Sequence, residues 1–147
     1  MKKVITLVVA VILTCHGAAT AALFKRADRQ YGHIAPLALS TKQLAILKSK
    51  AKKFDLNPNL LMAVLSVEVT RGQAEHILEN LDTYEWLVEQ IARVLKRCID
   101  RSEDVRFAIK YYAAGNFAPL GPVTDREAEG FAEETQNVLR QIQSGRR

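Results

Sequence analysis

From Ser40 onward, the sequence repeats one arrangement: a helix-capping signal followed by apolar residues at three- and four-residue spacing. Ser40, Asp82 and Thr124 are each followed three positions later by Gln or Glu, the pattern of a capping box. No stretch alternates apolar and polar residues for long enough to predict a strand. We therefore predict an all-α fold, a small single-domain bundle of about five to six helices.

The predicted helices follow from these caps and from turn-forming residues between them. Asn57 with Pro58 predicts the start of a second helix, because the missing N–H of proline costs nothing there. Ser102 opens another helix, and Gly115 closes it. The predicted helical ranges are residues 40–54, 57–72, 73–81, 82–99, 102–115 and 124–142, with a loop from 116 to 122.

The first residues resemble a secretory signal peptide. Met1–Lys3 is basic, residues 4–13 form an apolar run in which Thr6 is the one polar residue, and a stretch of small residues follows that ends at Ala21. An apolar run of ten is too short for a transmembrane anchor. We predict cleavage after Ala21 and export to the periplasm or the medium; a buried N-terminal helix is the alternative. Thr14 precedes Cys15 where a small residue is expected, which argues against lipid attachment there.

Cleavage would leave residues 22–147, an irregular lead-in over 22–39 followed by a helical domain over 40–147. Without Lys2 and Lys3 the chain keeps 19 basic against 16 acidic residues, a net charge of +3. The basic stretches are not interleaved with aromatic residues, as a single-strand-binding surface would be. The sequence thus predicts no nucleic-acid partner, whereas an anionic envelope polymer suits the charge.

Cysteine and histidine suggest neither a disulfide nor a metal site. Cys98 would be the one Cys left after cleavage, and its spacing places it on an apolar helical face, which favours a core position over pairing between chains. His16, His33 and His76 are scattered. Since no His, Cys or carboxylate cluster has ligand spacing, we predict no metal and no cofactor.

Glu68 differs from the other acidic residues because it lies in the apolar helix predicted over residues 57–72. Most others, Glu134 among them, have polar surroundings and are predicted to be solvated. A carboxyl in an apolar setting should have a raised pKa, as a general acid requires near neutral pH. The alternative is a helix end at which Glu68 and Arg71 meet solvent and pair weakly.

Two segments resemble the lytic transglycosylases of the lysozyme-like superfamily. The first is "AKKFDLNPNLLMAVLSVE", residues 51–68, with an aromatic residue, a turn before Pro, Leu-Leu-x-Ala and a Glu five residues after the Ala. The second is "AIKYYAAGN", residues 108–116, which is similar to the family's Tyr-Asn-Ala-Gly element, with Tyr112, Ala114 and Gly115 in register. The resemblance covers roughly residues 44–70 and 105–116.

The resemblance implies cleavage of the β-1,4 bond between N-acetylmuramic acid and N-acetylglucosamine in peptidoglycan glycan strands. Glu68 would act as acid and then as base, and Tyr112 would hold its hydroxyl near Glu68 across the cleft. Gly115, Trp86 and Phe117 are the candidate substrate-binding residues, although Trp86 at a helix start can equally serve packing. Small exported relatives often serve a secretion or conjugation apparatus, which is the partner expected by analogy.

Three departures from the family pattern leave other interpretations open. Val69 stands where the family has Ser, Ala113 stands where it has Asn, and no Gly-Leu-Met-Gln segment lies between Glu68 and Tyr112. One alternative is a catalytically degenerate protein that binds peptidoglycan or assists envelope assembly. Another is an unrelated exported helical bundle in which both matches arise by chance.

Overall fold

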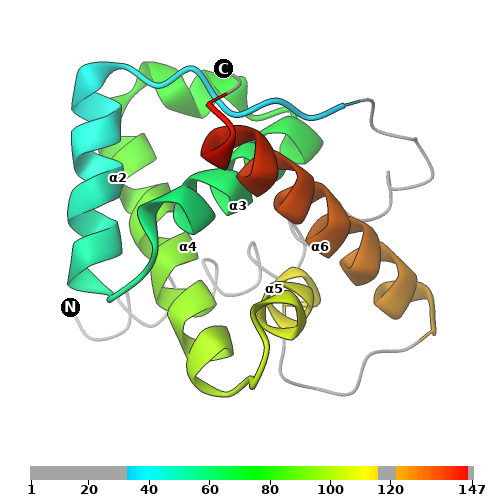
Figure 1. The fold of residues 1–147 in the computed structure, drawn as a ribbon. Helices are drawn as coiled ribbons and strands as arrows, with labels where there is room; N and C mark the ends of the chain where they lie inside the picture. Colours follow the sequence, from blue (N-terminus) through cyan, green and yellow to red (C-terminus); the bar gives the residue numbers. More distant parts are fainter. Residues whose placement is uncertain (1–32, 116–121, 146–147) are drawn as a thin grey trace, which may run out of the picture. The chain divides into compact units, whose positions relative to one another are not determined.

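The computed structural model describes residues 33–115 and 122–145 (Figure 1). The chain divides into two units, residues 1–31 and 32–147, and the fold below is that of the second. The predicted signal peptide therefore lies outside the described residues. Those residues form five α-helices and one 3₁₀ helix without strands, which confirms the all-α prediction. The elements are α2 (Thr41–Lys53), α3 (Pro58–Gly72), η1 (Glu75–Glu79), α4 (Leu81–Asp100), α5 (Val105–Ala113) and α6 (Pro122–Gln143).

The first two helices begin at the predicted caps. The backbone N–H of Gln43 donates to Ser40 Oγ, and the Gln43 side chain accepts in return from the Ser40 N–H, which completes a capping box. Asn57 Oδ1 accepts from the N–H of Asn59 at 2.8 Å, with Pro58 at the first helical position. Both caps satisfy N–H groups that a helix start leaves without partners.

Two later helices begin elsewhere than predicted. α4 is capped by Asn80, and Asp82 lies within its first turn. α5 is capped by Asp104, two residues after the predicted Ser102. Each segment offers two residues that favour the N-cap position, Asn80 and Asp82 in one and Ser102 and Asp104 in the other. Local preference alone therefore does not decide which of them caps the helix. In both helices the cap used is an Asx side chain that accepts from backbone N–H groups ahead of it.

Other helix boundaries also differ slightly from the prediction. α6 begins at Pro122, so Thr124 lies inside the helix instead of capping it. Gly72 is still helical in α3, and Gln73 adopts the left-handed conformation after it, with φ of 50°. The predicted short helix over 73–81 is the 3₁₀ helix η1.

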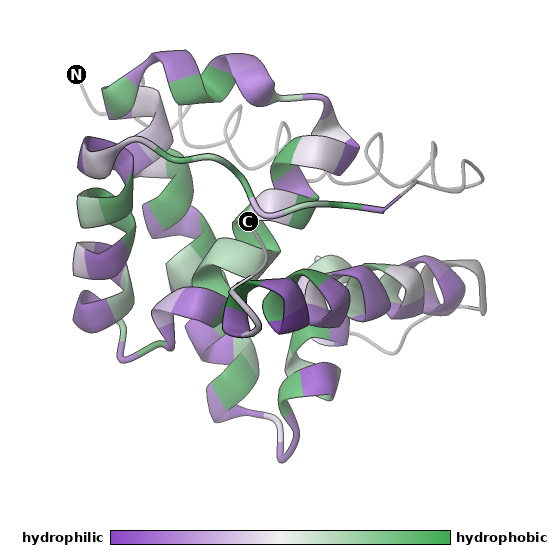
Figure 2. Ribbon diagram, turned by 45° about the horizontal axis from the view of Figure 1, so that its top comes forward, coloured by the Kyte–Doolittle hydropathy of each residue, from purple (hydrophilic) through white to green (hydrophobic). Residues whose placement is uncertain are grey.

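α3 is the central helix of the unit and packs against α2, α4 and α6. Apolar residues occur around its whole circumference, as expected for a helix that is buried on all sides and not only along one stripe. Figure 2 shows apolar segments on the sides of the helices that face one another. The buried residues of α3 are Leu60, Leu61, Ala63, Val64, Leu65, Ser66, Val67, Val69 and Arg71.

α2 and α4 run side by side in the same direction (Figure 1). At their first turns, Tyr84 Oη donates to the Gln43 carbonyl at 3.1 Å. Further along, Lys50 Nζ forms ion pairs with Glu85 and Glu89 at 2.6 and 2.7 Å. These contacts fix the register of α2 and α4.

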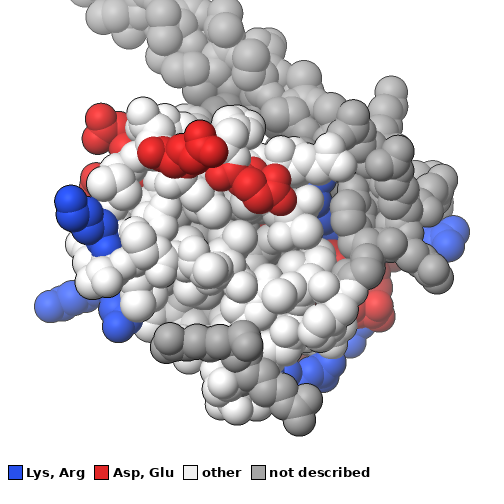
Figure 3. Space-filling model, turned by 90° about the horizontal axis from the view of Figure 1, so that it is seen from above, with Lys and Arg blue, Asp and Glu red and all other residues white. Residues whose placement is uncertain are grey.

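The end at which α2 and α4 begin carries exposed acidic side chains. Glu75 and Glu79 of η1 and Asp82 and Glu85 of α4 are exposed there. Figure 3, which views the molecule from that end, shows acidic groups gathered on this face and basic groups at its margins. Acidic residues at helix N-termini complement the helix dipole.

Ion pairs join α5 to α6. Lys110 Nζ contacts Asp125 at 2.6 Å and Glu129 at 3.2 Å. One turn earlier in α5, Arg106 also pairs with Glu129. Since earlier residues of α5 meet later residues of α6, the two helices are antiparallel. This arrangement brings the last turn of α5 to the first half of α6.

The segment before α2 is irregular from residue 33 to 39, as predicted for the lead-in. It is attached to α6 and α3, because Gln141 Nε2 donates to the Ile34 carbonyl at 2.9 Å and the Leu37 N–H donates to Ser66 Oγ at 3.2 Å. Cys98 is buried on α4, which confirms the predicted core position. None of the helices in the described part of the chain is long and apolar enough to cross a membrane.

Candidate functional site

Glu68 is a partly buried carboxyl in the last turns of the central helix α3. Its chain neighbours Val67 and Val69 are fully buried. Burial disfavours the charged form and raises the pKa of Glu68 above its ordinary value. A hydrogen bond from Tyr112 and the charge of Arg71 oppose this rise without cancelling it. The setting thus gives Glu68 the raised pKa that the sequence predicts.

Tyr112 meets Glu68 from α5. Its Oη donates to Glu68 Oε1 at 2.6 Å, across 44 positions of sequence. Burial and the nearby carboxylate raise the pKa of Tyr112 well above its ordinary value, so its hydroxyl stays protonated and remains a donor. The structure therefore brings together the two residues predicted as catalytic, at hydrogen-bond distance. When Glu68 is protonated, its proton is on Oε2, because Oε1 accepts the hydrogen bond from Tyr112.

Arg71 lies three residues after Glu68 and points into the protein. It is 7% exposed, and its Nε donates to Glu134 Oε2 of α6 at 2.6 Å. The alternative in which Glu68 and Arg71 meet solvent at a helix end is thus wrong for Arg71. The prediction that Glu134 is simply solvated is also wrong, because its carboxylate is the partner of a buried guanidinium.

Phe131 of α6 connects these groups. Its ring centroid lies 5.9 Å from that of Tyr112, with the planes tilted by 41°. The Arg71 guanidinium carbon lies 5.4 Å from the same centroid, within the range of a cation–π contact. We call Glu68, Arg71, Tyr112, Phe131 and Glu134 the Glu68 cluster, and it joins α3, α5 and α6.

Two members of the Glu68 cluster, Glu68 and Tyr112, are predicted from the sequence as site residues, whereas the other three are not. In the sequence, Phe131 belongs to the apolar face of the last helix, together with Ala128, Thr135 and Val138. Glu134 stands three positions after Phe131, so the two share a side of α6. An acidic residue at the edge of an apolar stripe was the available signal for Glu134. Arg71 had a similar signal, a cation at the end of an otherwise apolar helix.

Two of the three departures from the family motif, Val69 and Ala113, are core residues here. Val69 is 1% exposed and Ala113 is 2% exposed. Each lies next in sequence to a member of the central pair, Glu68 or Tyr112. The chain thus places apolar side chains, and not hydroxyl or amide groups, at both positions.

The predicted substrate-binding residues have different settings. Gly115 follows α5 with φ of 71°, a left-handed conformation that glycine adopts without strain, and its N–H donates to the Tyr112 carbonyl at 3.0 Å. It thereby ends the helix just beyond Tyr112. Trp86 is 47% exposed on α4. Phe117 lies outside the described residues.

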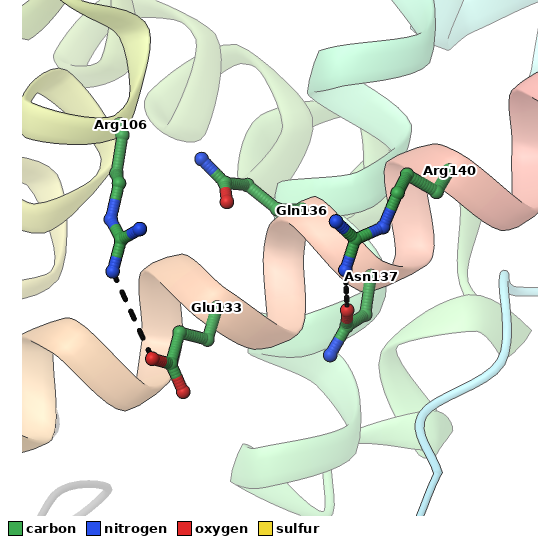
Figure 4. A pocket seen from close by; sticks show the side chains of 5 residues that line it. All are labelled: Arg106, Glu133, Gln136, Asn137 and Arg140. Atoms are coloured by element: carbon green, nitrogen blue, oxygen red, sulfur yellow. Dashed lines mark hydrogen bonds and ion pairs between the residues drawn. The ribbon is translucent and has the colours of Figure 1, made fainter.

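A separate surface hollow of about 290 Å³ lies along α6, lined by Arg106, Glu133, Gln136, Asn137 and Arg140 (Figure 4). Arg140 donates to Asn137, and Arg106 lies 3.8 Å from Glu133. Both guanidiniums therefore already have partners within the protein. The lining contains no member of the Glu68 cluster, so we place the candidate site at Glu68 and not at this hollow.

The Glu68 cluster can carry out acid–base chemistry. It holds one carboxyl with a raised pKa, one protonated hydroxyl and one guanidinium. Within residues 33–115 and 122–145, no three His, Cys, Asp or Glu side chains are grouped as metal ligands. Comparison with known proteins gave no match to a protein-family model, to a curated protein or to a solved structure.

Proposed function

We propose that this chain is an exported, lytic-transglycosylase-like protein that cleaves the β-1,4 bond between N-acetylmuramic acid and N-acetylglucosamine in peptidoglycan. The observation that carries the proposal is the 2.6 Å hydrogen bond from Tyr112 Oη to Glu68 Oε1. The residues that the family motif pairs come from segments 44 positions apart, and a chance resemblance gives no reason for them to meet.

In the proposed reaction, Glu68 acts first as acid and then as base. Its carboxyl gives a proton to the glycosidic oxygen, and the bond from that oxygen to C1 of the muramic acid breaks, with the electron pair going to the oxygen. The resulting carboxylate then takes the proton of the 6-hydroxyl of the same sugar as O6 bonds to C1. A 1,6-anhydro product forms without water, so a single carboxylate suffices, unlike in most glycosidases.

Each part of the site has a physical role in this scheme. Burial keeps the acid form of Glu68 available near neutral pH. The Tyr112 hydroxyl orients the carboxyl and stabilises its ionised form after the first proton transfer. Trp86, and Phe117 in the loop after Gly115, are the proposed sugar contacts. Local opening of the cell wall for a secretion or conjugation apparatus is the proposed setting.

The second candidate is a catalytically degenerate protein that binds peptidoglycan or assists envelope assembly. The observation that favours it is the burial of Val69 and Ala113 beside Glu68 and Tyr112. Apolar side chains there leave the carboxyl with fewer polar partners than the family motif supplies. On this hypothesis the fold and glycan affinity persist, and turnover does not.

Digestion of purified sacculi distinguishes the two candidates. The protein from Ala22 onward is incubated with sacculi, and soluble products are analysed by mass spectrometry for anhydro-muropeptides. We expect release by the wild type and none by Glu68→Gln, which keeps the shape of the side chain and removes its titrating proton. Glu133→Gln is the matched control, since its exposed carboxylate lies outside the Glu68 cluster, and it should remain active.

Pelleting with sacculi supplies the second measurement. Binding without release of anhydro products by the wild type would rule out the enzyme and support the binding protein. Neither binding nor release would rule out both and leave an unrelated helical bundle. Unfolding of Glu68→Gln, followed by circular dichroism, would assign Glu68 a structural role instead.

A further inference from the structure

Arg71 and Glu134 form an ion pair that is largely removed from water. The Arg71 side chain is 8% exposed and that of Glu134 is 21% exposed, with 2.6 Å between Nε and Oε2. Taking both charges out of water costs free energy that their attraction often only balances, and apolar replacements of such pairs are frequently neutral or stabilising. Stability alone is therefore a weak reason for this pair.

The Arg71–Glu134 ion pair is connected to the Glu68–Tyr112 pair by a continuous set of side-chain contacts. Tyr112 bonds Glu68 at 2.6 Å, the Tyr112 ring contacts Phe131 at 5.9 Å, and the Phe131 ring lies 5.4 Å from the Arg71 guanidinium carbon. Arg71 and Glu68 share α3, one turn apart. Glu134 anchors the guanidinium from α6, next to Phe131. A Cβ atom added at Gly130 would lie 3.4 Å from a guanidinium nitrogen of Arg71, so the backbone of α6 approaches the guanidinium closely at that point.

We propose that Arg71, held by Glu134, is a positioning residue for the Glu68–Tyr112 pair, so that α6 completes the reaction centre formed by α3 and α5. This inference rests on the proposed function and names how its site is controlled. A carboxyl that serves as acid and then as base must be reachable in both forms. Burial favours the acid form of Glu68, while the Arg71 charge favours the ionised form. Glu134 limits how strongly that charge acts.

The charged and titratable groups around Glu68 come from four helices. Arg71 on α3 and Tyr112 on α5 interact with Glu68 directly. Glu134 on α6 pairs with Arg71, and Cys98 on α4 interacts with Tyr112. Burial raises the pKa of Cys98 to about 11. Since Tyr112 and Cys98 are both neutral near pH 7, the charge that acts on Glu68 is that of Arg71, which is paired with Glu134.

Opposite charge removals should therefore move the titration of Glu68 in opposite directions. Arg71→Met removes the cation that favours the ionised form, so the pKa of Glu68 rises. Glu134→Gln removes the anion that neutralises Arg71, so the pKa of Glu68 falls. The first step requires protonated Glu68. The alkaline limb of the pH–rate profile on sacculi should therefore move to higher pH in Arg71→Met and to lower pH in Glu134→Gln.

The titration itself is measured without reference to activity. Carbon-13 labelling of glutamate carboxyls lets the Glu68 signal be followed by NMR through a pH series, assigned by its loss in Glu68→Gln. We expect the midpoint to shift up in Arg71→Met and down in Glu134→Gln. Arg106→Met, which removes an exposed arginine that also pairs across α5 and α6, is the matched control and should leave the midpoint unchanged.

Shifts in the same direction, no shift in either variant, or an equal shift in Arg106→Met would overturn the inference. If Arg71→Met does not fold, the double variant Arg71→Met/Glu134→Leu avoids leaving one ion uncompensated and should shift the midpoint up. A wild type that releases no anhydro product refutes the proposed function, while the NMR midpoints still decide the role of Arg71.

Discussion

Glu68→Gln should make the protein more stable at neutral pH while abolishing the proposed activity. Burial raises the pKa of Glu68 in the folded state, so the folded protein binds this proton more tightly than the unfolded chain. The stability that this group contributes is therefore fully present below its unfolded pKa, and it is lost as pH rises through the folded pKa. Glutamine has no such cost, because it stays neutral at every pH.

The change in stability depends on two free-energy differences between Glu and Gln at position 68, the cost of burying the ionised carboxyl and the strength of the Tyr112 hydrogen bond. Each unit by which the folded pKa exceeds the unfolded one costs about 1.4 kcal/mol at a pH above both. The Gln carbonyl oxygen can still accept the Tyr112 hydrogen bond, so the bond is weakened and not lost. We expect a net gain in the free energy of unfolding at pH 7.5, and each kcal/mol gained raises Tm by roughly 4 °C for a domain of this size.

The assay is thermal unfolding of wild type and Glu68→Gln at pH 7.5 and pH 4. The advantage of Gln should be present at pH 7.5 and nearly vanish at pH 4, where the folded wild type carries a neutral Glu68. Glu133→Gln, which removes an exposed carboxylate, controls for the change in net charge. A Glu68→Gln protein less stable than the wild type at pH 7.5, or an advantage equal at both values, would refute the claim that Glu68 is destabilised by burial.

Three further predictions concern single contacts. Tyr112→Phe removes a hydrogen bond that lowers the pKa of Glu68, so the Glu68 midpoint in NMR titration should rise; an unchanged midpoint would show that the bond is absent in solution. Two lysines of α2 lower the pKa of Glu89 to about 2, so the stability that Glu89 contributes is lost as pH falls from about 4.5 to 2. In Glu89→Gln, the free energy of unfolding should therefore depend less on pH in that window. The same pH dependence in both proteins would contradict this. Leu65→Ala in the fully buried face of α3 should cost about 2–5 kcal/mol in denaturant unfolding, whereas Leu81→Ala, 39% exposed, should cost far less; equal losses would contradict the placement of α3 at the centre of the fold.

Local signals were sufficient for the helices and for part of the site. Ser40 and Asn57 cap where the sequence predicts, because Gln43 completes a capping box with Ser40 and Pro58 suits the first helical position after Asn57. The start of α4 was misplaced because Asn80 and Asp82 both suit a cap. Glu68 was recognisable as the acidic residue inside an apolar helix, and Tyr112 through the family resemblance.

The sequence by itself determined the all-α class, the buried character of α3 and the unusual setting of Glu68, because caps, periodicity and local polarity act over a few residues. Only the tertiary structure decided which groups surround that carboxyl. The packing of α6 on α3 and α5 brings Phe131 to Tyr112 and Arg71, and it pairs Arg71 with Glu134 across 63 positions of sequence. Such contacts depend on how whole helices pack, and no spacing within one segment encodes them. Glu134 lies at the edge of an apolar stripe in the sequence, but only the packing of α6 on α3 gives its carboxylate a buried partner, Arg71.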